Sequence, residues 1–125
     1  NIPNPILDGA YRQNAAELGV VIDEEEDTFS RGSTDMGDVS HVVPSIHPTF
    51  QAAPRGTPVH SWAFTDASKD EAALDSMVTT AKILALTAYD LIVDRKTRDQ
   101  MAHAHRERFE KHVDHEDHEG HEAKR

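Results

Sequence analysis

Glycine and proline are concentrated between residues 32 and 65, and this stretch limits how the chain can fold. It contains Gly32, Gly37, Pro44, Pro48, Pro54, Gly56 and Pro58. Such a density of Gly and Pro indicates turns and chain reversals rather than long elements. Two short apolar runs rich in β-branched residues lie between these turns, at residues 39–43 and 46–50. Their length and composition predict two buried strands, with polar side chains available at the strand ends.

Helical patterns flank this stretch on both sides. Asn4 followed by Pro5 predicts a helix start, and Gly19 predicts the end of the same helix. Ser68 and Glu71 form a capping-box pattern that predicts the start of a long helix over residues 70–93. One face of this helix is apolar at helical spacing, and we expect that face to be the core: Leu74, Met77, Val78, Ala81, Leu84, Ala85, Ala88, Leu91 and Ile92.

A last helix is predicted over about residues 97–113, after a break that begins at Asp94. The sequence therefore predicts an α/β fold with the order helix, short strands, long helix and terminal helix, in one unit over residues 1–113. Residues 114–125 are mostly His, Asp and Glu with almost nothing apolar, which predicts a disordered tail. Since the first residue is Asn1 rather than Met, we expect the sequence to be a piece of a longer chain.

Charge and composition disfavour several classes of function. The formal net charge of −10 would repel the phosphate backbone, so no nucleic-acid partner is expected. We find no uninterrupted apolar run near the length of roughly 20 residues that spans a bilayer, and no signal peptide, so no membrane partner is expected. Cysteine is absent, which excludes thiolate ligands and thiol nucleophiles and suits a reducing, cytoplasmic location.

The histidines and acids of the central stretch are the candidate site residues. His60 lies in a loop before the capped helix, and neutral imidazole is a common zinc ligand, although a lone loop histidine is more often a surface residue. His47 is open to the same two interpretations. Asp35 and Asp38 flank Gly37, where an aspartate either bonds neighbouring amides in a turn or orients a ligand histidine. No residue is predicted to be a nucleophile or a general base.

Two other charged segments favour simple interpretations. Residues 23–27 are five consecutive acids, which we interpret as a solvated connector rather than a cation site. The C-terminal segment carries histidines that could bind transition metals adventitiously or could belong to a charged, soluble end: His103, His105, His112, His115, His118 and His121.

The order of short motifs resembles a known family. The motifs are Asn4-Pro-Ile-Leu, Gly32-Ser-Thr-Asp-Met-Gly-Asp-Val-Ser, Val43-Pro-Ser-Ile-His-Pro-Thr-Phe and His60-Ser-Trp-Ala-Phe-Thr. From about Asn4 to Asp94 the chain resembles the C-terminal part of the zinc-dependent amidohydrolase/peptidase family. This family includes aminoacylase, hippurate hydrolase, carboxypeptidase G, aminobenzoyl-glutamate hydrolase and related dipeptidases.

The resemblance implies a function for a longer protein. It implies a di-zinc, homo-oligomeric enzyme that hydrolyses an amide bond in a dipeptide or N-acyl amino acid with a metal-activated water. His60 matches the last metal ligand of the family, and Asp35, Asp38 and His47 become candidates for the pocket wall or for orienting a ligand. The other ligands and the general base lie upstream in the family, so the fragment alone is expected to be inactive.

Two alternatives to the amidohydrolase interpretation stay open at this stage. One is a non-catalytic, acidic helical interaction module with a His-rich metal-binding tail. The other is a degenerate family member that serves as a scaffold.

Overall fold

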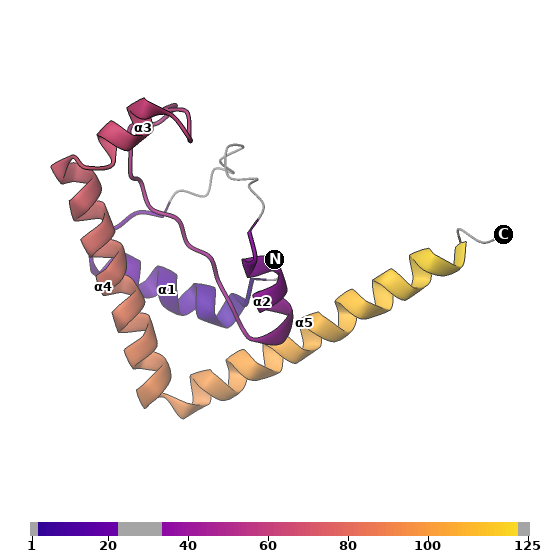
Figure 1. Cartoon of the computed structure of the whole chain (residues 1–125). Coiled ribbons are helices and arrows are strands. Elements are labelled where there is room, and N and C mark those ends of the chain that lie inside the picture. The colour runs from indigo at the N-terminus through magenta and orange to yellow at the C-terminus, as the bar shows by residue number, and fades with distance from the viewer. Residues whose placement is uncertain (1–2, 23–33, 123–125) are drawn as a thin grey trace.

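The computed structural model describes residues 3–22 and 34–122, with side chains through residue 108. The helices in these ranges are α1 (Pro5–Glu17), α2 (Met36–Val42), α3 (Trp62–Ala67), α4 (Glu71–Val93) and α5 (Arg95–Glu122). Helix α1 packs against both α4 and α5, and α4 turns sharply into α5 (Figure 1). An extended segment runs from the end of α2 to α3 across these helices (Figure 1).

Helix α1 begins and ends as its sequence predicts. The Asn4 side-chain oxygen accepts hydrogen bonds from the amides of Ile6 and Leu7, at 3.2 and 3.1 Å. Pro5 occupies the first helical position, where its missing N–H costs no hydrogen bond. Gly19 follows the helix with φ of +74°, a left-handed conformation that glycine adopts without a Cβ clash. Capping and termination are thus encoded locally.

The core is small and centres on α1. Ala15 and Ile83 are each only 1% exposed and Tyr11 is 6% exposed, with Val20, Ile22 and Ile46 packed around them. Burial raises the pKa of the Tyr11 hydroxyl, since the phenolate loses hydration there. Ile83 of α4 therefore packs against the face of α1 that carries Tyr11 and Ala15.

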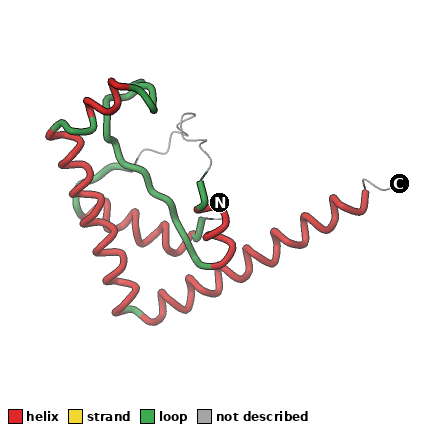
Figure 2. The backbone as a smooth tube through the Cα atoms, in the orientation of Figure 1, coloured by secondary structure: helices red, strands yellow, loops and turns green. Residues whose placement is uncertain are grey.

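The predicted strands are not present among the described residues, which are helical or irregular in Figure 2. Residues 39–42 lie in α2 rather than in a strand, so the β-branched composition was overridden there. Residues 46–50 are extended but have no partner strand. The nearest feature is an isolated parallel bridge between Pro3 and Ser45, with Asn4 N–H donating to the Ser45 carbonyl at 2.9 Å. The α/β expectation is therefore not confirmed by the described residues, which are mostly helical.

The start of α4 differs from the capping-box prediction. Ser68 is the residue that ends α3, and its hydroxyl donates to the Thr65 carbonyl at 2.9 Å. Helix α4 starts at Glu71 with Asp70 at the N-cap, and the Asp70 side chain makes no capping hydrogen bond. A short helix immediately before α4 thus uses the serine for its own C-terminal turn.

The join between α4 and α5 lies where the sequence places it. Asp94 ends α4, and its carboxylate accepts from the amides of Lys96 and Thr97 and from the Thr97 hydroxyl, at 2.9, 3.3 and 2.6 Å. These hydrogen bonds lower the pKa of the Asp94 carboxyl. Helix α5 then continues to Glu122, beyond the predicted end at residue 113. The domain boundary at 113/114 stays a prediction.

The face of α4 that packs on α1 is not the face predicted from its spacing. Its buried residues are Ala73, Ile83 and Thr87, whereas Leu74, Met77, Val78 and Leu84 are between 45% and 47% exposed. By length and composition, α4 is also long and apolar enough to cross a membrane, contrary to the sequence-based expectation. Core helices of proteins meet the same criterion, so this finding alone assigns no membrane role.

Candidate functional site

His60 lies in a turn immediately before α3, and its backbone has an unusual conformation. Its φ is +58°, and it is the non-glycine residue with positive φ among the residues that the structure describes. Left-handed backbone is uncommon outside glycine, although histidine adopts it more readily than most residues. The His60 side chain is exposed. The turn therefore leaves His60 accessible to solvent.

The residue after His60 fixes this turn to α3. The Ser61 hydroxyl accepts from the Phe64 amide at 3.1 Å and donates to the Pro58 carbonyl at 2.6 Å. Ser61 is the N-cap of α3, so the helix start and the preceding turn share one side chain. The sequence predicted that His60 lies in a loop before a helix capped by Ser68, whereas the structure shows that the next residue, Ser61, caps the helix that follows His60.

Asp35 and Asp38 lie at the start of α2 and are both exposed. Asp35 occupies the N-cap position without a side-chain capping hydrogen bond; instead the Thr34 hydroxyl accepts from the Met36 amide, at 3.4 Å. Acidic residues near a helix N-terminus are favoured by the helix dipole, which is a structural reason for Asp38. The expected Asx-turn at Asp35 is therefore replaced by a threonine contact, and its carboxylate stays available to solvent.

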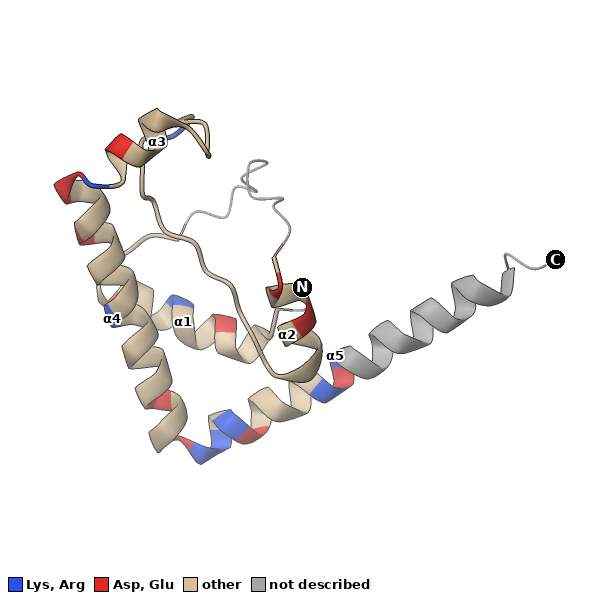
Figure 3. Cartoon of the chain, viewed as in Figure 1, with Lys and Arg blue, Asp and Glu red and all other residues tan. Residues whose placement is uncertain are grey.

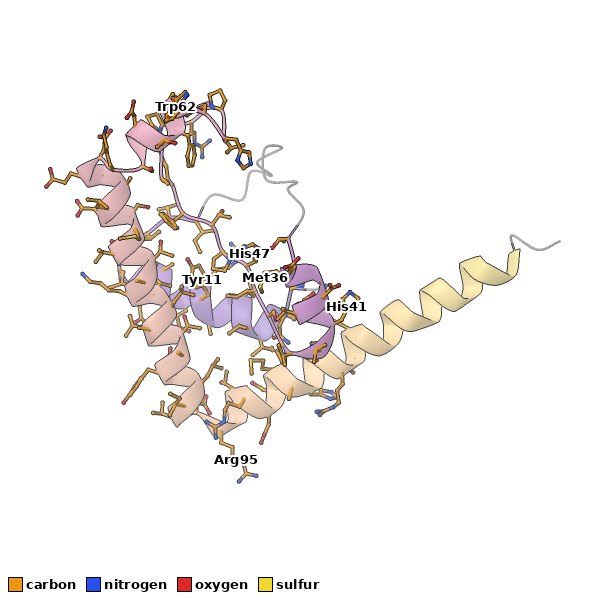
Figure 4. The ribbon with its side chains drawn as sticks, viewed as in Figure 1. Tyr11, Met36, His41, His47, Trp62 and Arg95 are labelled. Carbon is orange, nitrogen blue, oxygen red and sulfur yellow. The ribbon has the colours of Figure 1, made fainter. Side chains whose placement is uncertain are left out.

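His47 is exposed on the extended segment that follows α2. Figure 4 labels His47 partway along this segment and Trp62 at the start of α3, at the segment's far end. The turn that carries His60 and the helix that carries Asp35 and Asp38 thus lie at opposite ends of the same segment (Figure 1). The structure describes these four residues as separate surface groups rather than as one assembled cluster.

The described part of the chain does not form a complete metal site. It contains no group of three or more His, Cys, Asp or Glu side chains placed to hold one ion. His103 and Glu107 approach to 3.6 Å on α5, an i, i+4 pair at the surface. The side chains of the later tail histidines and the acids at 23–27 lie outside the described residues.

An open depression of about 230 Å³ lies between the extended segment and the start of α4. Its lining includes Gln51, Ala53, Asp70, Ala73 and Ser76, and none of the four candidate site residues. Its polar groups are the Asp70 carboxylate, the Ser76 hydroxyl and the Gln51 amide, and no His or Cys lines it to complete a catalytic pair or a ligand set. The depression therefore assembles no catalytic chemistry.

A buried polar cluster between α1 and α4 was missed by the sequence analysis. The Asn14 amide donates to the Ala10 carbonyl, to Thr87 Oγ1 and to Asp90 Oδ2, at 3.0, 3.3 and 2.8 Å. Asn14 is 4% exposed. The sequence does give one signal for this cluster. Asn14 lies three residues after Tyr11 and four before Leu18, on the apolar face of α1. A polar residue at such a position indicates a buried hydrogen-bonding group that fixes helix packing.

Comparison with known proteins gives sequence relatives. No family model and no solved structure match the chain. The Xaa-Arg dipeptidase of Mus musculus is 42% identical over 95 residues, and that of Homo sapiens is 39% identical over 93 residues. Each match covers 73% of this chain and 21% of the relative.

The length of the match limits where it can lie along this chain. A continuous stretch of 73% of 125 residues includes residues 35–91 wherever it begins, and so includes all four candidate site residues. The chain spans about a fifth of the length of the curated relatives that it matches. By sequence it is related to a limited part of two mammalian proteins named Xaa-Arg dipeptidase.

Proposed function

We propose that this chain is a portion of a metal-dependent dipeptidase of the amidohydrolase/peptidase family. The observation that carries the proposal is the 39–42% identity to proteins named Xaa-Arg dipeptidase. The complete enzyme would hydrolyse the amide bond of a dipeptide with arginine as its second residue. Because the chain spans only 21% of those relatives, the catalytic base and most ligands would lie in polypeptide outside it.

His60 is proposed to supply one ligand to a zinc ion of the complete enzyme. Its exposed imidazole and the Ser61 anchor of its turn support this role, because a ligand must be accessible and held in place. A catalytic zinc usually has three protein ligands, and the described residues offer no group of that size. We therefore assign this chain a single ligand and no catalytic step of its own.

Asp35, Asp38 and His47 are proposed to line the substrate pocket or to orient a ligand. Both carboxylates are exposed, and Asp35 is not used as a helix cap. Carboxylates form strong, charge-assisted hydrogen bonds with a guanidinium group, which is the chemistry an arginine side chain would require. The proposal thus has three parts: zinc as the metal, a pocket role for these three residues, and a preference for arginine in the dipeptide.

The test requires a longer polypeptide that contains this chain and a region equivalent to the rest of the relatives. We expect it to hydrolyse dipeptides that end in arginine faster than dipeptides that end in glutamate or N-acyl amino acids. Chelation should abolish the activity and added zinc should restore it. The 125-residue chain assayed under the same conditions is the control and should be inactive. Chelator-resistant activity, or no hydrolysis by a folded and zinc-loaded protein, would contradict the proposal.

A further inference from the structure

Helix α4 has two apolar faces, of which α1 covers one. Ala73, Ile83 and Thr87 are 7%, 1% and 4% exposed, and they follow one another at intervals that place them on one side of the helix. The Thr87 hydroxyl donates to the Ile83 carbonyl and contacts the Asn14 amide, so this side is fixed against α1. The helix therefore cannot rotate its other face inward without breaking the Asn14 cluster.

The uncovered face is a continuous apolar stripe, called here the α4 stripe. It comprises Leu74, Met77, Val78, Ala81, Leu84, Ala85, Ala88 and Ile92. Each of these residues is exposed, with Leu74 at 47% and Ile92 at 74%. Successive positions 74, 78, 81, 85, 88 and 92 alternate four- and three-residue steps, the spacing that keeps one helix face against a partner.

The stripe is also nearly free of charge. Figure 3 shows α4 tan over most of its length, with few blue or red positions between its ends. Monomeric proteins rarely expose a contiguous apolar surface of this length, and such surfaces mark contacts with other polypeptide or with lipid. The occupant therefore needs an apolar, uncharged face several helical turns long, with bulky side chains opposite Ala81, Ala85 and Ala88.

We infer that the α4 stripe is a surface for polypeptide equivalent to the remaining four-fifths of the dipeptidase relatives. The matched region includes residues 35–91 and hence nearly all of the stripe, whereas 79% of each relative has no counterpart in this chain. The missing length is thus large enough to supply the required apolar face. This inference rests on the proposed function and identifies which surface of the chain joins the rest of the enzyme.

The experiment compares the double variant Val78→Glu/Ala85→Glu with the control Lys82→Glu in two contexts. Lys82 lies on the same helix, is exposed and is already polar, so a glutamate there should have little effect. In the 125-residue chain, the exposed stripe should cause self-association and hydrophobic-dye binding. The double variant should lose both and keep its helix content. In the longer polypeptide, the same variant should reduce the folded, soluble yield about tenfold or more, because two unpaired charges become buried.

Several outcomes would overturn the inference. One is a longer polypeptide that tolerates the double variant as well as it tolerates Lys82→Glu. Another is a folded longer polypeptide whose variant loses only dimerisation, which would assign the stripe to a second copy of the chain. Vesicle binding that the variant abolishes would assign it to lipid. A further outcome concerns the proposed function alone. If the folded wild-type longer polypeptide hydrolyses no dipeptide while the double variant still loses folded yield, the proposed function is refuted and this inference stands.

Discussion

At the scale of single residues, side chains with defined hydrogen-bond partners account for most of what is fixed in this fold. Asn4 caps α1 and also donates to the Met101 carbonyl at 2.9 Å, which ties the start of the chain to α5. Arg108 extends the same link by donating to the Pro3 carbonyl at 2.8 Å. The cap was predictable because its partners lie two and three residues away. The link to α5 was not, because its partner lies 97 residues further along the chain.

The Asn14 cluster gives a prediction at this scale. Asn14→Ala should lower the free energy of unfolding of the chain by about 1–3 kcal/mol, because it removes the donor to the Thr87 hydroxyl and the Asp90 carboxylate on α4. Urea titration followed by far-ultraviolet circular dichroism measures this change. Gln13→Ala is the matched control, since Gln13 is exposed and contacts only Glu17 within the same helix. Equal stability of the two variants would show that the cluster does not hold α1 on α4.

At the scale of elements, the helices followed from local signals and the strands did not. Pro5, Gly19 and Asp94 act through neighbours within a few residues, so the limits of α1 and the end of α4 could be predicted. A strand depends on a partner elsewhere in the chain, and the described residues offer residues 46–50 none. Ser68 misled because it belongs to the C-terminal turn of α3, and α4 has Asp70 at its N-cap instead.

The α4–α5 corner gives a prediction of pH dependence. The folded pKa of Asp94 is lowered by its hydrogen bonds to Thr97 and Lys96, so its stabilising effect is complete above the unfolded pKa. That unfolded value is about 3.9, and the effect is lost as the pH falls through the lower folded pKa. Thermal melts between pH 7 and pH 2 should therefore show the Asp94→Asn variant approaching the wild type at the acid end. A constant difference across this range would exclude the carboxylate as the cap of α5.

At the scale of the whole molecule, the face of α4 with the best helical spacing is uncovered. The sequence marks that face as core, and it stays exposed because the chain contains too little polypeptide to cover two sides of one helix. Spacing along the chain could identify the candidate site residues, but it could not predict how far apart they lie, because that distance depends on packing between residues far apart in sequence.

The C-terminal segment gives a prediction at this scale. Deletion of residues 114–125 should leave the helix content per residue of the remaining chain and its melting behaviour unchanged, because the hydrogen bonds that join α5 to Pro3 and Asn4 involve Met101 and Arg108, which precede the deleted segment. Weak nickel or zinc binding by the 125-residue chain should disappear with the deletion and persist in His60→Ala. Calorimetric titration with each metal distinguishes the two variants. Binding that survives the deletion and is lost in His60→Ala would reverse the assignment.

The proposed function depends most directly on the imidazole of His60. His60→Gly in the longer polypeptide retains the positive φ of the turn, since glycine adopts that conformation freely, and removes only the side chain. Metal content and hydrolysis of a dipeptide ending in arginine should be measured on this variant beside the wild type and an Asp38→Asn variant. The proposed ligand role of His60 predicts an unchanged fold, a loss of zinc and of most activity in His60→Gly, and a smaller loss, of about 10- to 100-fold, in Asp38→Asn. Wild-type zinc content and activity in His60→Gly would contradict it.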